Sequence, residues 1–190
     1  ASPTTRQQTK QAPPAPPPPP SPTPTRTAAI VAGSGGGGRG GHQRPPIPAP
    51  SGGVISGVPR VVDGDSLEVA GHRIRLFGID APESRQDCRD GQGRFYACGR
   101  KARDALAAAI GGGAVACTPV GESYDRDVAI CTAGGRDLSE TMVRGGHALE
   151  LAQHSRGRYT AAERDARAAR RGLWEGSFER PAQWRQEHPR

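Results

Sequence analysis

The sequence is poor in aromatic side chains and has no long apolar run. Phe, Trp and Tyr together make up 4% of its 190 residues, and lysine is scarce because 24 of the 26 basic residues are arginine. The longest apolar run, residues 105–110, is far shorter than the ~20 residues that a membrane-spanning helix requires. We therefore expect no membrane span, and we give the arginine bias no functional weight.

Acidic residues are absent from residues 1–53, which hold most of the prolines and five basic residues. Residues 12–25 favour polyproline II, and the glycines of 33–41 favour a flexible joint. We predict a disordered Pro/Gly-rich tail at residues 1–53, followed by one folded domain at residues 54–190. That domain carries 21 basic and 19 acidic residues, a formal charge of +2. Its charge alone does not indicate a nucleic-acid binder.

Zinc-binding spacing is also missing, because the four cysteines form no Cys-x-x-Cys motif and the five histidines are scattered. Cys117 and Cys131 lie symmetrically about Tyr124, so they would face each other in a symmetric hairpin. Cys88 and Cys98 would form the second disulfide. Two disulfides in a small domain predict a secreted or periplasmic protein. The start at Ala1 fits a cleaved signal peptide, although a trimmed chain would also begin this way.

Two predicted strands place acidic residues at both ends of a hairpin. Residues 61–69 and 73–78 alternate apolar and polar side chains around a turn at Gly71. Antiparallel pairing would bring Asp65, at the start of one strand, near Asp80, at the end of the other. Converging carboxylates with a backbone carbonyl suit calcium or magnesium better than zinc.

Two further side chains, Arg75 and Glu83, would flank this acidic site. Phosphodiester hydrolysis requires a cation, a guanidinium that can donate two hydrogen bonds to the phosphate, and a further carboxylate. Taken singly, each acid is equally explained as a turn residue or a strand end, and Arg75 could pair with Glu68 or Glu83 across the hairpin.

The remaining pattern indicates an α+β fold. Residues 102–110 carry an apolar helical stripe, and 114–120 and 127–132 have the pattern of strands. Asp137-Leu-Ser-Glu140 resembles a capping box at the start of a second helix. Thr160-Ala-Ala-Glu163 is predicted to start a third. Strands and helices do not alternate regularly, which argues against a doubly wound sheet.

Several motifs occur in one order along the chain: Asp63-Gly64-Asp65-Ser66, Arg75-Leu76, Gly78-Ile79-Asp80-Ala81-Pro82-Glu83, Tyr124-Asp125-Arg126 and Gly172-Leu173-Trp174. With them, the region from about Val58 to Trp184 resembles the thermonuclease (staphylococcal nuclease-like) family. The resemblance implies a five-stranded OB-type β-barrel with three helices, a fold that often presents one face to nucleic acid. Trp174, Phe178 and Trp184 are expected to pack on the barrel.

The resemblance also implies a metal site. Asp65 and Asp80 would bind one divalent cation, calcium in this family, together with the carbonyl oxygen of Ala81. Asp63 would help to position these ligands without binding the cation itself.

Roles in catalysis follow from the same resemblance. Glu83 would take a proton from the attacking water, Arg75 and Arg126 would hold the phosphate, and Tyr124 would hydrogen-bond the nucleotide. The expected activity is that of an endonuclease that cleaves DNA and RNA and leaves 3′-phosphates. A monomer is expected.

The chain departs from the family pattern at two places. Asp125 and Asp127 flank Arg126, where the family usually has glycine before the arginine, so these acids could draw the guanidinium away from phosphate. Leu149 and Leu151 stand where the family has an aromatic pair that stacks on a base. The alternative function is an OB-type module that binds nucleic acid or protein and has lost catalysis.

Overall fold

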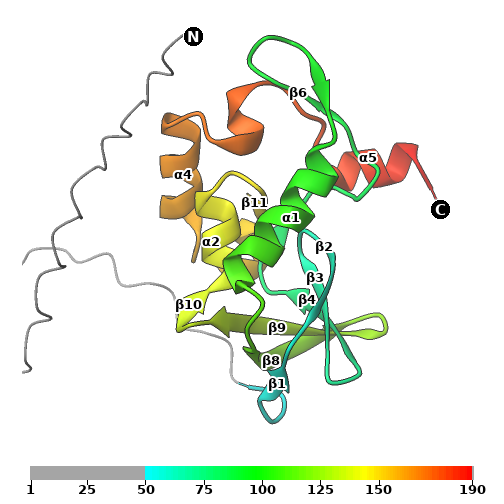
Figure 1. The fold of residues 1–190 in the computed structure, drawn as a ribbon, viewed down its shortest axis with the longest axis vertical. Coiled ribbons are helices and arrows are strands. Elements are labelled where there is room, and N and C mark those ends of the chain that lie inside the picture. Colours follow the sequence, from blue (N-terminus) through cyan, green and yellow to red (C-terminus); the bar gives the residue numbers. More distant parts are fainter. Residues whose placement is uncertain (1–49, 190) are drawn as a thin grey trace, which may run out of the picture. The chain divides into compact units, whose positions relative to one another are not determined.

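A computed structural model describes residues 50–189, which fall within one compact unit of the chain. The predicted tail, residues 1–53, lies almost wholly outside the described residues, so that prediction remains untested. The described part is a mixed α+β fold in which one large sheet carries most of the strands (Figure 1).

The large sheet contains seven strands. Its order is β1 (Ile55–Gly57), β8 (Val115–Ser123), β9 (Arg126–Ala133), β4 (His72–Leu76), β3 (Ser66–Val69) and β2 (Arg60–Asp63), with β10 (Arg136–Asp137) also paired to β9. Neighbours are antiparallel except β4 and β9, which are parallel. Between residues 50 and 189 these pairings do not close the sheet into a barrel.

Two short strand pairs lie outside the large sheet. The pair β5 (Ile79–Asp80) and β11 (Leu149–Glu150) sets Leu149 opposite Asp80, and β6 (Cys88–Arg89) pairs with β7 (Phe95–Tyr96). Leu149 is buried. It therefore supports the backbone of Asp80 and offers no surface to a base.

Five α-helices occur among the described residues, where the family resemblance predicts three: α1 (Cys98–Ile110), α2 (Leu138–Arg144), α3 (Ala152–Ser155), α4 (Thr160–Ala168) and α5 (Pro181–Glu187), with a 3-10 turn at Gly172–Glu175. The predicted stripe on α1 is confirmed, because Ala102, Leu106 and Ile110 are buried and the helix stops at Gly111, which has a φ of 68°. No helix between residues 50 and 189 is long and apolar enough to cross a membrane.

Both predicted helix starts are confirmed. The side chain of Asp137 accepts a hydrogen bond from the backbone N–H of Glu140 at 3.2 Å, as predicted for the capping box of α2. The helix α4 begins at Thr160, as predicted, although the Thr160 side chain does not cap it. Its hydroxyl donates to the buried carboxylate of Glu150 at 2.6 Å, and Glu150 also accepts the N–H of Tyr159 at 2.7 Å.

Most apolar side chains gather in one core between the large sheet and the helices α1 and α2. Its fully buried members include Leu67, Ile74, Leu76, Leu106 and Tyr159. A smaller cluster contains Leu149 and Leu173, with the packed rings of Trp174 and Phe178 beside them, which agrees with the expectation for those two aromatics. Trp184 differs, because it stacks on His188 within its own helical segment.

Both predicted disulfides are present, and none of the four cysteines is free. Cys117 and Cys131 are direct partners in the β8–β9 register with their Cα atoms 4.0 Å apart. Cys88 joins β6 to Cys98, the first residue of α1, with a Cα separation of 5.5 Å. The second bond therefore ties the loop beyond Glu83 to α1.

Replacing both Cys117 and Cys131 by Ala should lower the free energy of unfolding by about 3 kcal/mol, because the crosslink closes a loop of 14 residues. Denaturant unfolding of the oxidised proteins measures this loss. Saturating reductant should remove most of the difference between the variant and the parent protein. Four reactive thiols in unfolded, oxidised parent protein would contradict both bonds.

Candidate active site

The turn between β2 and β3 directs Asp65 into the protein. Asp63 accepts the backbone N–H of Asp65 on its side-chain oxygen at 3.1 Å, which fixes the turn. A Cβ atom on Gly64 would lie 2.7 Å from the Cβ of Ala81 and 2.8 Å from that of Ala102. Only glycine fits, so this turn packs directly against the chain after β5 and against α1.

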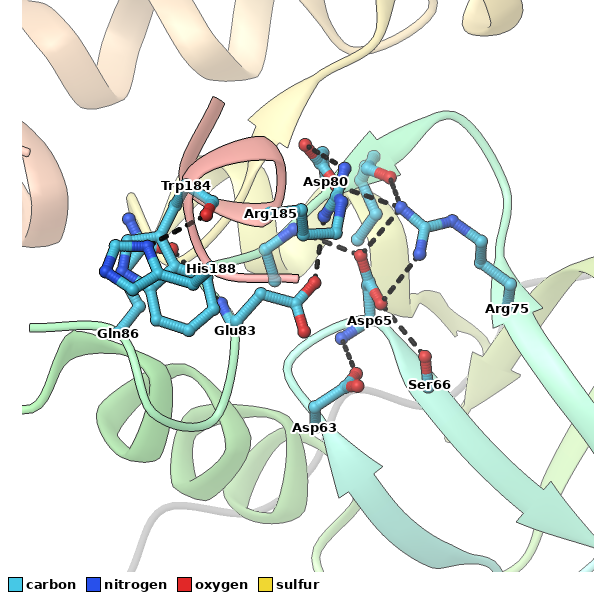
Figure 2. Close-up of polar contacts among 12 residues, drawn as sticks. Asp63, Asp65, Ser66, Arg75, Asp80, Glu83, Gln86, Trp184, Arg185 and His188 are labelled. Atoms are coloured by element: carbon cyan, nitrogen blue, oxygen red, sulfur yellow. Dashed lines mark hydrogen bonds and ion pairs between the residues drawn. The ribbon is translucent and has the colours of Figure 1, made fainter. Parts of the chain in front are cut away.

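Two buried carboxylates, those of Asp65 and Asp80, meet at the guanidinium of Arg75 (Figure 2). The Nη2 atom of Arg75 lies 3.1 Å from Oδ2 of Asp65 and 2.9 Å from Oδ1 of Asp80. The hairpin thus brings the two acids together, as its pattern predicts. Arg75 does not pair with Glu68, whose carboxylate instead accepts a hydrogen bond from Arg60.

Asp65 is the more strongly perturbed of the ionisable groups in this cluster. Burial raises the pKa of its carboxyl to about 7, and the nearby charges of Asp63 and Asp80 also act to raise it. The guanidinium of Arg75 and the backbone N–H of Ala81, which donates to Oδ2 of Asp65 at 3.1 Å, oppose this shift. Burial is thus the main reason why the charged form of Asp65 is disfavoured.

A third carboxylate, that of Glu83, is held at the same place by its backbone. The N–H of Glu83 donates to the side-chain oxygen of the buried Gln86 at 3.2 Å, and Gln86 donates in turn to the carbonyl of Glu179 at 2.7 Å. A Cβ atom on Gly99 would lie 1.8 Å from the carbonyl oxygen of Glu83. The chain at Glu83 therefore rests directly on the first turn of α1.

The sequence pattern missed Arg185, which reaches this cluster from α5 (Figure 2). Its Nη1 donates to Oδ1 of Asp80 at 3.0 Å and to Oε1 of Glu83 at 2.9 Å, and its Nη2 donates to Oδ2 of Asp80 at 3.2 Å. The only sequence signal nearby is Pro181, which suits the first position of a helix. No local pattern could pair residues 105 positions apart.

The tip of the β8–β9 hairpin carries the other predicted residues. Tyr124 is 98% exposed with a φ of 57°, and Arg126 is half-buried at the start of β9. Asp125 pairs with Arg73, and Asp127 contacts Nδ1 of His72 at 3.1 Å. The hypothesis that these two acids hold Arg126 is therefore wrong.

Within the described part of the chain, the Arg126 side chain makes no ion pair or hydrogen bond, and strand pairing places it on the same face as Arg75. In the parallel pair β4–β9, Arg75 lies opposite Val128. Side chains alternate along a strand, so Arg126, two residues before Val128, shares the face of Arg75 roughly 7 Å farther along β9. Both guanidiniums can approach a ligand from this face.

The oxygen donors fit a hard divalent cation that keeps part of its water shell. The carboxylates of Asp65 and Asp80 converge, and the backbone of Ala81 follows directly in the chain. Across residues 50–189, no cluster of three or more His, Cys, Asp or Glu side chains suits a metal. Waters would therefore supply the remaining ligands, as is common for magnesium and tolerated by calcium.

The protein has a mixed α+β fold with a buried acidic cluster, arginines that pair with these acids, and an exposed hairpin beside them. Such a site is suited to a cation and a phosphate group. Comparison with known proteins defines the family. Residues 73–176 match the family model described as staphylococcal nuclease homologue. The chain belongs to this family, as the motifs predict.

Curated relatives agree with this assignment. The chain is 34% identical over 123 residues to the succinoglycan biosynthesis protein ExoI of Rhizobium meliloti, covering 63% of this chain and 64% of that protein. It is 32% identical over 126 residues to the probable staphylococcal-like nuclease CAN3 of Oryza sativa, covering 65% of this chain and 31% of that protein. An uncharacterized endonuclease of Escherichia coli O157:H7 is 32% identical over 124 residues, which cover 62% of this chain and 74% of that protein. The match thus spans less than two thirds of the first two relatives.

Gly99→Ala should lower the free energy of unfolding by about 2 kcal/mol. The clash with the Glu83 carbonyl costs about 3 kcal/mol, while alanine regains about 1 kcal/mol of helix propensity. Gly121→Ala is the control, because no atom lies within 4 Å of the added Cβ, and it should stay within about 0.5 kcal/mol of the parent. Denaturant unfolding measures the stability of the parent protein and the two variants. Equal stability of all three would contradict the close contact between Gly99 and the Glu83 carbonyl.

Proposed function

We propose that this protein is a metal-dependent phosphodiesterase, an endonuclease that cleaves DNA and RNA with calcium as its cation and leaves 3′-phosphates. The observation that carries the proposal is the convergence of Asp65, Asp80 and Glu83 around guanidinium groups at one end of the sheet. Membership of the family supports nuclease chemistry and implies an OB-type arrangement of the strands.

In this proposal Asp65, Asp80 and the carbonyl of Ala81 hold the cation, and Asp63 holds the turn that presents Asp65. The bound cation would supply positive charge near the phosphate oxygens and acidify water. Burial of Asp65 and Asp80 keeps the two carboxylates in fixed positions, so little reorganisation is needed when substrate binds.

The chain's other side chains would act on the phosphodiester and the attacking water. Glu83 accepts the proton of that water. Arg75 and Arg126, on one face of the sheet, bind the phosphate oxygens and stabilise the charge that grows there in the transition state. Tyr124, exposed at the hairpin tip, can hydrogen-bond the nucleotide with its hydroxyl.

The alternative is a nucleic-acid or protein-binding module of the same fold without catalysis. One observation favours it, the pairing of Glu83 with Arg185, because a carboxylate engaged by a guanidinium is not presented to water in that arrangement. A module of this kind would bind DNA without any cleavage, so a cleavage assay separates the two functions.

Two disulfides support a secreted or periplasmic location, since such bonds persist in oxidising compartments. We propose this location, and a monomer, for the protein. The nucleic acids that serve as substrates would then be met outside the cytosol.

The purified protein should degrade plasmid DNA and RNA when calcium is present, and excess chelator should abolish this activity. Two carboxylates and a carbonyl bind a divalent ion only modestly, so a chelator competes well. Parallel reactions with calcium, magnesium or chelator, analysed on gels, give the result. Full cleavage in excess chelator would overturn the metal assignment, and DNA binding without cleavage under every condition would favour the binding module.

Glu83→Gln should lower kcat by roughly 10²- to 10⁴-fold with little change in KM, because glutamine keeps the size of the side chain but cannot accept the proton. Steady-state cleavage of an oligonucleotide measures both constants. Glu122→Gln, an exposed change on β8, is the matched control and should cleave like the parent. Retention of most of the rate by Glu83→Gln would move the role of base to another carboxylate, Asp63 or Asp125.

A further inference from the structure

The guanidinium of Arg185 uses the same oxygens that a cation needs. Oδ1 of Asp80 accepts from Arg75 at 2.9 Å and from Arg185 at 3.0 Å, and Oδ2 accepts from Arg185 at 3.2 Å. A carboxylate offers about four acceptor positions, so three of those on Asp80 are taken. About one position remains, so a cation on Asp80 would have to share this carboxylate with two guanidinium groups.

Repulsion acts in the same direction as this competition. A divalent cation on Asp80 would lie within a few ångströms of the Arg185 charge, in a site where Asp80 is 2% exposed and screening by water is weak. The charges agree in direction. Withdrawal of Arg185 removes one positive charge from beside Asp80 and Glu83, and a divalent cation would restore positive charge there.

The helix that carries Arg185 can leave at small cost. Of the seven residues of α5 only Pro181 is buried. The contact between Gln86 and the carbonyl of Glu179 lies before the helix, so it holds the base about which α5 can turn. The stack of Trp184 on His188 lies within the same segment and moves with it. Release would therefore break the Arg185 contacts, and the large apolar side chains that it could expose are those of Pro181 and the half-buried Trp184.

We propose that Arg185 sets the cation affinity of this site by competing with the cation for Asp80, and that α5 moves away from Asp80 when a divalent cation binds. The inference rests on the cation site of the proposed function. It goes beyond that function because the proposed function gives Arg185 no role. While the contact persists, Glu83 is paired and the cation site is covered.

Calcium titration by calorimetry, without nucleic acid, tests the proposal. Arg185→Gln should bind calcium with a Kd about tenfold or more below that of the parent, within the usual range of coupling between two sites. Arg185→Lys should lie between them, because an ammonium group keeps the charge but cannot span the oxygens of Asp80 and Glu83. Arg180→Gln, an exposed change at the N-terminal end of α5, is the control and should stay within about twofold of the parent.

Movement of α5 has its own readout, the fluorescence of Trp184 in a Trp174→Phe background. Calcium should shift the emission of the Trp174→Phe protein. The double variant Trp174→Phe with Arg185→Gln should already show the shifted emission without calcium. Thermal unfolding without calcium checks that all variants fold. Equal or weaker calcium binding by Arg185→Gln would overturn the proposal, and so would calcium binding by none of the proteins. Tighter binding by Arg185→Gln, with no cleavage by any protein, would uphold this inference while refuting the nuclease function.

Discussion

The burial of two carboxylates around one guanidinium is the constraint on which the site's architecture depends. Asp65 and Asp80 are nearly inaccessible to water, and a buried charge is tolerated only when it is paired and hydrogen-bonded. Arg75 supplies the pairing and the backbone N–H of Ala81 a further hydrogen bond. The glycine at position 64 lets the turn approach closely enough for these contacts to form. Buried charges of this kind lower the stability of the folded protein, and such clusters are typical of functional sites.

The parallel pairing of β4 with β9 connects this cluster to the exposed hairpin. It sets Arg126 on the face of Arg75, while the neighbouring acids bind elsewhere, Asp125 to Arg73 and Asp127 to His72. The acids beside Arg126 therefore anchor the hairpin tip to β4 rather than neutralise the arginine. The acids that flank Arg126 suggested weaker phosphate binding. Because they pair with Arg73 and His72 instead, they leave the Arg126 guanidinium available to a ligand.

Features fixed by short-range physics were predictable from the sequence. The acidic hairpin, the end of α1 at Gly111 and the Asp137 cap depend on residues a few positions apart, and the cross-strand disulfide followed from spacing about Tyr124. The failures involve distant partners. Thr160 starts α4 as predicted, yet its hydroxyl donates to the buried Glu150, which no sequence pattern marked. The seven residues of α5 are too short for a periodic signal, and the partners of Arg185 lie more than 100 positions away.

The parts of the chain that the sequence predicts and the helix that it does not predict also differ in how they contribute to the site. The acids, Arg75 and Arg126 sit on strands and turns whose geometry is held by the sheet, so their positions are set before any ligand arrives. Arg185 sits on a lightly packed helix, where a contact can be exchanged without disturbing the core. In the proposed exchange, the fixed carboxylates would have two charge arrangements. In the arrangement of this structure, arginines compensate the acids, and in the other a divalent cation would replace one of these arginines.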